Sequence, residues 1–489
     1  GLGARGAIAI AGRLGDAGIA AFRSPALPLS RFIERPLVHV PEVELVSEVE
    51  LSPGVDRYLD DHVIDGARVM PAVLQIEAAH QVVAALAPAG RWRIAAVAFP
   101  RAIVVDDDGA RIRIAACLLD DGRAEIVVTA SADDHRAECM RMTLEPDATP
   151  PGRPTGAVVD GGGLPAPYGE LLPQRGRFAR IAGYQQLETR SCRFSVRTAS
   201  DAGPWFAHHA PAALCLADPG VRDAMLHGMQ VAVPHHRLVP VAARDVRLAA
   251  NWPPGEVVVE ARELAGRDGE YTWTLVARDA HGAEIERWSE VTFRSLGQRR
   301  AIPGLAVRPW LERCLGELAP AVRIAAFDAA ALAPEPLPGV VRRPDHRPEV
   351  RGGSISMTTG AGFRFAVTGP EGVACDLEAI EARPAEVWRD LLGTHAELAA
   401  ELARRSGEPF DHAATRVWTA LECAAKLGHP APHLLLVSAT ATAAAFRAGA
   451  IEVTTLVVQV IGRGWVAIAV AVSAAPMMAE TMARIDAAS

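Results

Sequence analysis

Lysine is almost absent from this chain of 489 residues. Of its 50 basic residues only Lys426 is a lysine, and all the others are arginines. An arginine cannot replace a lysine where a compact point charge is needed, because the guanidinium group is a planar fork of donors. Lys426 is therefore a candidate functional residue. The alternative is that this one lysine remains by chance and has no function.

Cysteine is also scarce, and no two cysteines form a CxxC pair. An odd number of scattered cysteines predicts reduced, mostly buried thiols in a cytoplasmic protein rather than a disulfide framework. No set of ligands has the spacing of a zinc site, so zinc is not expected. The seven are Cys117, Cys139, Cys192, Cys215, Cys314, Cys375 and Cys423.

Long apolar runs and an excess of positive charge are missing as well. The longest apolar run, 465–472, has the length of a strand and not of a membrane span. A net charge of −8 gives no basic footprint for nucleic acid or an anionic membrane. The chain begins at Gly1 without an initiator Met or a convincing signal sequence, as expected of a piece of a longer polypeptide.

Apolar periodicity predicts the same plan twice between residues 36 and 300. Each copy has a strand region, one buried helix and four further strands, separated by a Pro-, Gly- and Asp-rich linker at 145–165. This layout predicts an α+β double hotdog, in which antiparallel strands wrap around two central helices and the halves, 36–145 and 166–300, share a groove. The predicted helices are 71–86 and 221–233; the predicted strands are 94–105, 110–119, 124–130, 136–144, 187–196, 238–249, 256–264, 271–278 and 284–293.

The most informative motif begins at His62, with Gly66 four residues later and Pro71 nine residues later. Pro71 stands where the first helix should begin, and a missing amide is harmless there. Gly66 allows a sharp turn and a close approach of the backbone to a ligand. The imidazole would then face a helix N-terminus whose amides can polarise a carbonyl. The motif predicts a proton-abstraction site beside a thioester.

The second predicted helix carries Asp223 and His227, which share one face at a spacing of four residues. A surface pair is the simpler explanation of such a spacing alone. The HxxxGxxxxP pattern at His62, however, resembles that of the dehydratase domains of polyketide and fatty acid synthases, which are double hotdogs. Those domains carry a catalytic Asp on the second central helix, followed four residues later by Gln or His.

This resemblance implies a role for each residue in the syn elimination of water from a 3-hydroxyacyl thioester. His62 would remove the C2 proton as a neutral base, and a protonated Asp223 would protonate the departing hydroxyl. His227 would orient Asp223, and the backbone amide around Gly66 would bind the thioester oxygen. His80 is expected to be structural or to line the groove. Surface loops are favoured over groove lining for His208, His209, His235 and His236.

The last third of the chain holds a second constellation of polar residues. A strand ending in Asp376-Leu377-Glu378 aims two carboxylates in one direction, and Glu422 and Lys426 share a helix face. Three acidic side chains with open positions suit Mg²⁺ holding a pyrophosphate, and the ammonium group can meet the remaining phosphate charge.

These residues resemble the signatures of phosphopantetheinyl transferases, (V/I)G(V/I)DxE and W(S/T)xKE(A/S)xxK, and Trp418 and Thr419 match as well. The resemblance implies that Asp376, Glu378 and Glu422 bind Mg²⁺. Glu422 would also help deprotonate the carrier serine, and Lys426 would hold a phosphate of coenzyme A. The sequence departs from the family pattern at Met357, Ala374 and Leu421. The alternative is that this domain keeps the transferase fold but has no catalytic activity. The residues assigned to the coenzyme A subsite are Arg342, Arg343, Arg347, Ser356 and Lys426.

A dehydratase followed by a transferase at 301–489 resembles the end of enediyne-type iterative polyketide synthases, with 1–35 as the tail of a preceding domain. Such a protein would dehydrate chains on an acyl carrier protein and load that carrier with 4′-phosphopantetheine. The expected partners are the carrier, the other synthase domains and a second copy of the chain, without nucleic acid or membrane. A hotdog thioesterase and a non-catalytic carrier-binding scaffold are the alternatives.

Overall fold

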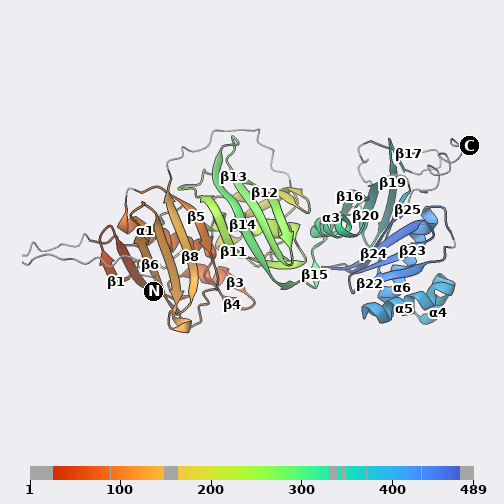
Figure 1. The fold of residues 1–489 in the computed structure, drawn as a ribbon, viewed down its shortest axis with the longest axis horizontal. Helices are drawn as coiled ribbons and strands as arrows, with labels where there is room; N and C mark the ends of the chain where they lie inside the picture. The colour runs from red at the N-terminus through yellow and green to blue at the C-terminus, as the bar shows by residue number, and fades with distance from the viewer. Residues whose placement is uncertain are drawn as a thin grey trace, which may run out of the picture.

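The computed structural model describes residues 26–88, 90–147, 163–329, 337, 339–342, 348–369, 372–430 and 432–473. Most of the tail expected at 1–35 and most of the linker expected at 145–165 lie outside these residues. Two bodies follow one another along the chain, a large sheet with enclosed helices and a smaller α+β body (Figure 1). No helix among the described residues has the length and apolar character needed to cross a membrane.

The first body is a single antiparallel sheet of twelve strands in the order β1-β2-β6-β7-β8-β5-β11-β14-β13-β12-β10-β9. It consists of two half-sheets that meet where β5 pairs with β11. The strands of the first half are β1 (Arg35–Val40), β2 (Glu44–Leu51), β5 (Trp92–Ala98), β6 (Ala110–Leu118), β7 (Ala124–Ala130) and β8 (Glu138–Pro146). Those of the second half are β9 (Ile181–Leu187), β10 (Ser191–Arg197), β11 (His236–Arg247), β12 (Glu256–Arg267), β13 (Glu270–Arg278) and β14 (Glu284–Gln298).

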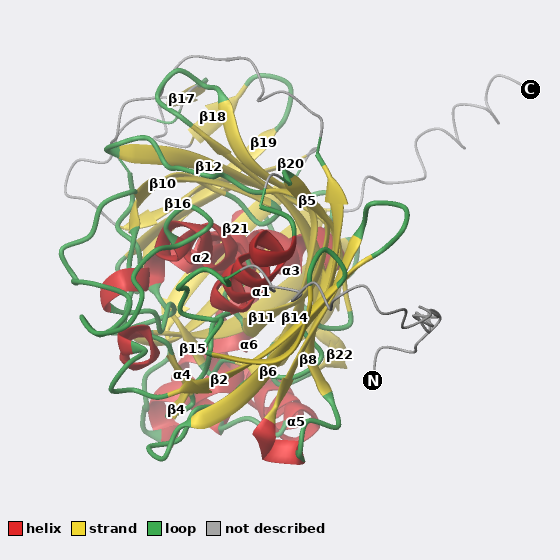
Figure 2. Ribbon diagram, turned by 90° about the vertical axis from the view of Figure 1, so that its left-hand side faces the viewer, coloured by secondary structure: helices red, strands yellow, loops and turns green. Residues whose placement is uncertain are grey.

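The two halves repeat one topology, each with two strands, a buried helix and then four strands. The helix of the first half, α1 (Ala72–Leu86), packs on β2, β6 and β7, and that of the second half, α2 (Pro219–Gly228), packs on β10 and β13. The two helices also contact one another and lie inside the curve of the strands (Figure 2). Because both halves place equivalent strands at their junction, the expected double hotdog is confirmed.

Three predicted elements have different limits in the structure. The strand expected at 187–196 is β10 together with the turn before it, in which the Glu188 amide donates to the Ser191 carbonyl, and β9 was not expected. The strand expected at 94–105 ends at Ala98, and Pro100 shortly after it has no amide to continue a ladder. The second helix is α-helical only to Gly228 and continues as a 3₁₀ turn, η4 (Met229–Ala232).

The second body contains two main sheets and a layer of helices. One sheet has five strands in the order β21-β25-β24-β23-β22, and the short strand β15, which follows β14 in the chain, pairs with β24 in parallel. The other sheet has the strand order β16-β20-β19. The helix α6 packs on β21, β24 and β25, and α5 packs on α6. The helices α3, α4 and α5 were not predicted from the sequence. The elements are β15 (Ala301–Ile302), α3 (Val307–Leu318), β16 (Arg323–Ala329), β17 (Val340–Arg342), β18 (Pro348–Val350), β19 (Ser354–Gly360), β20 (Phe363–Gly369), β21 (Val373–Ala379), α4 (Ala385–Leu392), α5 (Ala396–Ser406), α6 (Phe410–Lys426), β22 (Leu435–Ala439), β23 (Ala443–Ala448), β24 (Ile451–Val460) and β25 (Gly464–Ser473).

A fully buried ion pair ties α2 to the sheet. The Arg222 guanidinium group donates from Nε to Glu286 Oε1 at 2.9 Å and from Nη2 to Glu286 Oε2 at 2.9 Å. The same carboxylate accepts from the Ala249 amide and from the Trp288 indole, and Arg222 also donates to the Ala217 and Ala249 carbonyls. Both charges are therefore satisfied without water, which makes this pair the main polar link between α2 and β14.

Replacing Glu286 with Ala is expected to lower the free energy of unfolding of this body by about 3–5 kcal/mol, because it strands a buried guanidinium charge. The double variant Arg222→Met with Glu286→Leu should cost less than the single variant, since it removes both charges. Calorimetric unfolding of the full chain measures both. A single variant no less stable than the double variant would contradict this view of the pair.

Candidate active site

His62 lies at the base of a tight hairpin between η1 (Arg57–Asp61) and α1. The hairpin strands β3 (Val63–Ile64) and β4 (Ala67–Arg68) are joined by Asp65 and Gly66, with φ of 50° and 84°. Positive φ at both turn residues is the type I′ geometry that Asp-Gly favours. Gly66 thus supplies the sharp turn expected of it. Its neighbours Asp65 and Ala67 line the adjacent cavity, but Gly66 is not among the described lining residues.

One hydrogen bond determines which nitrogen of His62 can act as a base. The Nδ1 atom lies 2.8 Å from the Val69 carbonyl oxygen, which can only accept a hydrogen. The proton of the neutral ring is therefore on Nδ1, and Nε2 keeps its lone pair. The side chain is 8% exposed, and its ring meets Phe178 edge-on at 5.4 Å. His62 is held in the tautomer that a general base requires.

Residues of the second half hold the His62 hairpin in place. Asp61, the residue before His62, forms an ion pair with Arg177 and accepts the Arg177 amide at 3.1 Å. Its carbonyl oxygen accepts the Arg175 amide at 3.1 Å. On the other side of the hairpin, Arg237 on β11 pairs with Asp65 at 2.5 Å. The position of a first-half histidine therefore depends on the second half.

Asp223 lies on α2 at one end of a hydrogen-bonded chain. Its Oδ2 atom is 3.0 Å from His227 Nδ1, and His227 Nε2 is 3.2 Å from the Tyr168 hydroxyl. That hydroxyl oxygen accepts the Ile181 amide at 3.0 Å, so its own proton is available to His227. With Nε2 accepting, Nδ1 carries the ring proton and donates to Asp223. Asp223 Oδ1 is left out of this chain.

Tyr168 stays protonated in this environment. Burial raises the pKa of Tyr168 well above its usual value, and the charge of Asp223 raises this pKa further, against the lowering effect of the Ile181 amide. The hydroxyl group is then a reliable donor near neutral pH. No local sequence pattern indicated this role for Tyr168, which lies far ahead of the second predicted helix.

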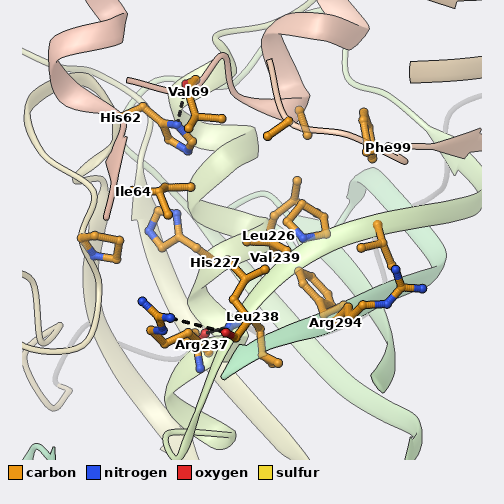
Figure 3. Close-up of a pocket in the computed structure, with 18 of the residues that line it drawn as sticks. His62, Ile64, Val69, Phe99, Leu226, His227, Arg237, Leu238, Val239 and Arg294 are labelled. Carbon is orange, nitrogen blue, oxygen red and sulfur yellow. Dashed lines mark hydrogen bonds between the residues drawn. The ribbon is translucent and has the colours of Figure 1, made fainter. Parts of the chain in front are cut away.

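A cavity of about 550 Å³ lies between the two halves and receives these side chains (Figure 3). His62 and Gln75 enter it from the first half, and Asp223 and His227 from the second. Asp223 is 6% exposed, so both titratable groups present little of their surface to solvent. The first helical residue, Ala72, also lines the cavity, and the first amides of a helix have no intrahelical partner. The expected shared groove is present in this form.

The other five histidines for which the sequence predicted a location fall into three groups. His80 is buried on α1 and contacts the Ile76 carbonyl at 2.9 Å through Nδ1, and burial lowers its pKa to about 4, in keeping with a structural residue. His208 and His209 are exposed, as expected. His235 and His236 instead are half-buried, and their rings meet edge-on with centroids 4.4 Å apart. The expectation of an ordinary surface loop is wrong for this pair, because the loop after α2 packs under β14 and α3.

The acidic residues of the second body meet Lys426 at the edge between β21 and α6. Asp376 is buried, and its Oδ1 accepts from Lys426 Nζ at 2.9 Å and from Thr358 Oγ1 at 3.2 Å. Lys426 also donates to the Cys375 carbonyl at 2.8 Å. Burial raises the pKa of Glu378, and the charges of Asp376 and Glu422 raise it further. The three carboxylates are thus near enough to act on one another.

Two features bear on whether these carboxylates can hold a cation. Asp376 Oδ2 is buried without a hydrogen-bond partner, as expected of an oxygen that awaits a ligand. Yet no three His, Cys, Asp or Glu side chains in the described part of the chain are grouped as a ready-made metal site. The donor chemistry fits a hard cation, but the side chains would have to draw together around it.

The remaining residues assigned to coenzyme A are placed less favourably. The Ser356 hydroxyl group is buried and accepts the Cys375 amide at 3.1 Å, so it already has a structural partner. The backbone of Arg342 belongs to β17. Arg343 and Arg347 lie outside the described residues.

Comparison with known proteins gives two family matches and a set of similar folds. Residues 33–131 match the family described as polyketide synthase dehydratase domain, and residues 176–302 match that described as polyketide synthase dehydratase N-terminal domain. The dehydratase domain from the CurF module of curacin polyketide synthase is 12% identical, with a TM-score of 0.43 over 55% of this chain and 100% of that chain. The dehydratase domain of the polyketide PpsC from Mycobacterium tuberculosis is 19% identical, with a TM-score of 0.42 over 55% and 98%. No curated protein matches the chain.

The tautomer of His62 can be tested without any substrate. Nitrogen-15 NMR of the full chain, with the His62 signal assigned from His62→Gln, should show the neutral ring protonated at Nδ1, because the Val69 carbonyl accepts there. A neutral ring protonated at Nε2 would contradict the geometry of this site. His80, which contacts a carbonyl through the same nitrogen, serves as the internal control.

Proposed function

Since residues 33–131 and 176–302 match polyketide synthase dehydratase families, we propose that this body dehydrates a 3-hydroxyacyl chain tethered to an acyl carrier protein, with His62 as base and Asp223 as acid. The proposal depends mainly on one observation. A histidine with a free Nε2 and an aspartate with a free Oδ1 line the same cavity from opposite halves of the fold.

In the proposed reaction, His62 Nε2 takes the C2 proton of the thioester. The electrons left on C2 delocalise onto the thioester oxygen, to which the first amides of α1, beside the cavity-lining Ala72, would donate hydrogen bonds. Asp223 Oδ1 gives its proton to the 3-hydroxyl group as the C3–O bond breaks. A double bond forms between C2 and C3 and water leaves. The proton on His62 then returns to Asp223 through solvent, which restores the starting state.

The chain from Tyr168 through His227 has a positioning role in this scheme. By donating to Asp223 Oδ2, His227 leaves Oδ1 as the atom that carries the transferable proton. Tyr168 fixes the His227 tautomer, because its hydroxyl group donates to Nε2 while accepting the Ile181 amide. Asp223 can therefore act as an acid in one orientation only.

Replacing His62 with Ala, or Asp223 with Asn, is expected to slow enoyl formation by about 10²–10⁴-fold, the usual contribution of a general base or acid. Intact-mass analysis of a 3-hydroxyacyl carrier protein would follow the loss of one water. Arg287→Met, which removes a β14 arginine paired with Glu284 and not lining the cavity, is the matched control. Free acid instead of enoyl product would favour a thioesterase, and undiminished dehydration by His62→Ala would refute its role as base.

We propose a second activity for residues 301–489, the transfer of 4′-phosphopantetheine from coenzyme A to the carrier serine. The unpartnered Asp376 oxygen, beside two further carboxylates and the single lysine of the chain, favours it. Asp376, Glu378 and Glu422 would hold Mg²⁺, whose chemistry is to offset the charge of a pyrophosphate. Lys426 would turn from Asp376 toward a phosphate, and Glu422 would accept the serine proton.

Such a pair of activities would belong at the end of an enediyne-type iterative synthase acting as a homodimer. Apo carrier protein incubated with the full chain, coenzyme A and Mg²⁺ is expected to gain one phosphopantetheine by intact mass. Glu422→Ala should abolish the gain and leave dehydration intact, because the two sites are in separate bodies. Failure of the unmodified chain on a carrier that a conventional transferase can load would reduce this body to a scaffold.

A further inference from the structure

A glutamine on the wall of the active-site cavity has an acceptor atom that the proposed chemistry does not use. Gln75 lies on α1, lines the cavity and is 3% exposed. Its Nε2 donates to the Met70 carbonyl at 3.3 Å, but its Oε1 is buried without a hydrogen-bond partner. A buried amide oxygen without a partner costs free energy, because it has lost its water and gained no hydrogen bond in exchange. At a cavity wall, such an atom indicates a hydrogen bond that forms when a ligand is present.

The contact with Met70 determines which end of the Gln75 amide is free. The Met70 carbonyl oxygen can only accept a hydrogen, so the NH₂ group of Gln75 faces it and the amide oxygen points elsewhere. The Met70 amide is itself bonded to the Ile103 carbonyl, which holds this segment in place. Gln75 therefore presents a fixed acceptor, and the partner that it lacks is a donor.

Two other glutamines line the same cavity and differ from Gln75. Gln230 Oε1 accepts the Leu238 amide at 2.8 Å, so its acceptor is occupied. Gln174 Oε1 is buried without a partner, but the residue is partly exposed and lies in a loop. Of these three side chains only Gln75 is both buried and unpartnered at its oxygen, and only Gln75 lies on a central helix of the fold.

Gln75 lies about one helical turn from the amides assigned to the thioester oxygen. It follows Ala72 by three residues, which puts both side chains on one face of α1. The helix α1 contacts α2, which carries Asp223. A 3-hydroxyacyl thioester held by the amides beside Ala72 would therefore bring its 3-hydroxyl group between an acceptor on α1 and the proposed acid on α2.

We propose that Gln75 Oε1 accepts a hydrogen bond from the 3-hydroxyl group of the substrate and thereby selects its configuration at C3. This inference rests on the proposed dehydratase function, because that function supplies a substrate with this hydroxyl group. A hydroxyl group has one hydrogen to donate and two lone pairs that accept. When Asp223 Oδ1 donates to a lone pair, the hydroxyl hydrogen still needs an acceptor, and His62 Nε2 faces the C2 proton instead. Gln75 supplies that acceptor.

Two hydrogen bonds to one hydroxyl group act on the reaction and on its stereochemistry. As the C3–O bond breaks, Asp223 gives its proton to the hydroxyl oxygen. The departing water keeps its hydrogen bond to Gln75, which neither gains nor loses a proton. The positions of C2, the hydroxyl group and the acyl tail fix three of the four directions at C3, and a substrate of the opposite configuration cannot satisfy all three at once. Gln75 therefore determines specificity for one configuration.

The test compares probes that differ only at C3. Both configurations of 3-hydroxyoctanoyl-pantetheine, and octanoyl-pantetheine without the hydroxyl group, are titrated by calorimetry into the full chain carrying His62→Ala, which slows consumption of the probes. One hydroxylated probe should bind more tightly than octanoyl-pantetheine. Adding Gln75→Met, which keeps the length of the side chain without a strong acceptor, should weaken binding of that probe about tenfold and leave octanoyl-pantetheine binding unchanged.

Two further variants and a rate measurement separate a lost hydrogen bond from a changed cavity shape. Gln75→Glu, whose oxygens can still accept, should retain part of the preference for the hydroxylated probe, and Arg287→Met should retain all of it. In chains with an intact His62, Gln75→Met should lower kcat/KM for the preferred configuration about tenfold. The other configuration should lose less, so the ratio between the two falls.

Failure of this proposal and failure of the dehydratase proposal give different results. No preference for either hydroxylated probe over octanoyl-pantetheine, including no binding of any probe, would overturn the hydroxyl site even if dehydration persists. An equal loss for all three probes in Gln75→Met would overturn it too, as would a preference that survives Gln75→Met and disappears in Gln174→Met. A preference abolished by Gln75→Met, in a chain that forms no enoyl product from any thioester, would support the hydroxyl site and refute the dehydratase proposal.

Discussion

The buried contact between Arg222 and Glu286 is the constraint on which the rest of the first body depends. The helix α2 has only ten residues, too few to keep its place by helix propensity alone. Every donor nitrogen of the Arg222 guanidinium group is bonded to Glu286 on β14 or to a nearby carbonyl oxygen. These bonds fix the position of α2 on the sheet and the rotation of α2 about its own axis. Asp223 directly follows Arg222 on α2. The burial of Arg222 against β14 therefore sets the direction in which the Asp223 carboxyl group enters the cavity.

The duplicated topology explains how two unlike groups come to face one another. Both halves place a helix behind the same set of strands, and the halves join through the equivalent strands β5 and β11. The first half contributes His62, the proposed base, from the loop before its helix, and the second contributes Asp223, the proposed acid, from the helix itself. The ion pair of Asp61 with Arg177 then holds the loop of one half against the other. One cavity therefore receives chemistry from both copies.

The sequence allowed most of this body to be predicted, because its signals are local. Pro71 and the apolar run after it indicated α1 to within one residue, and the spacing of Asp223 and His227 placed them on one helix face. The strand β9 and the turn at 188–190 were missed, because the expected strand began at Leu187 and took in the turn together with β10. Tyr168 and Arg177 escaped notice as partners of the site because they meet His227 and Asp61 across 59 and 116 positions. No periodicity encodes such contacts.

The central claim is that His62 and Asp223 act together on one substrate in one step. Dehydration rates of His62→Ala, Asp223→Asn and the double variant, with the unmodified chain, form a cycle that measures this most directly. Groups that act as a unit are strongly non-additive, so the double variant should be about as slow as the slower single variant. Rate losses that multiply would mean that the two residues act independently, and would contradict the account.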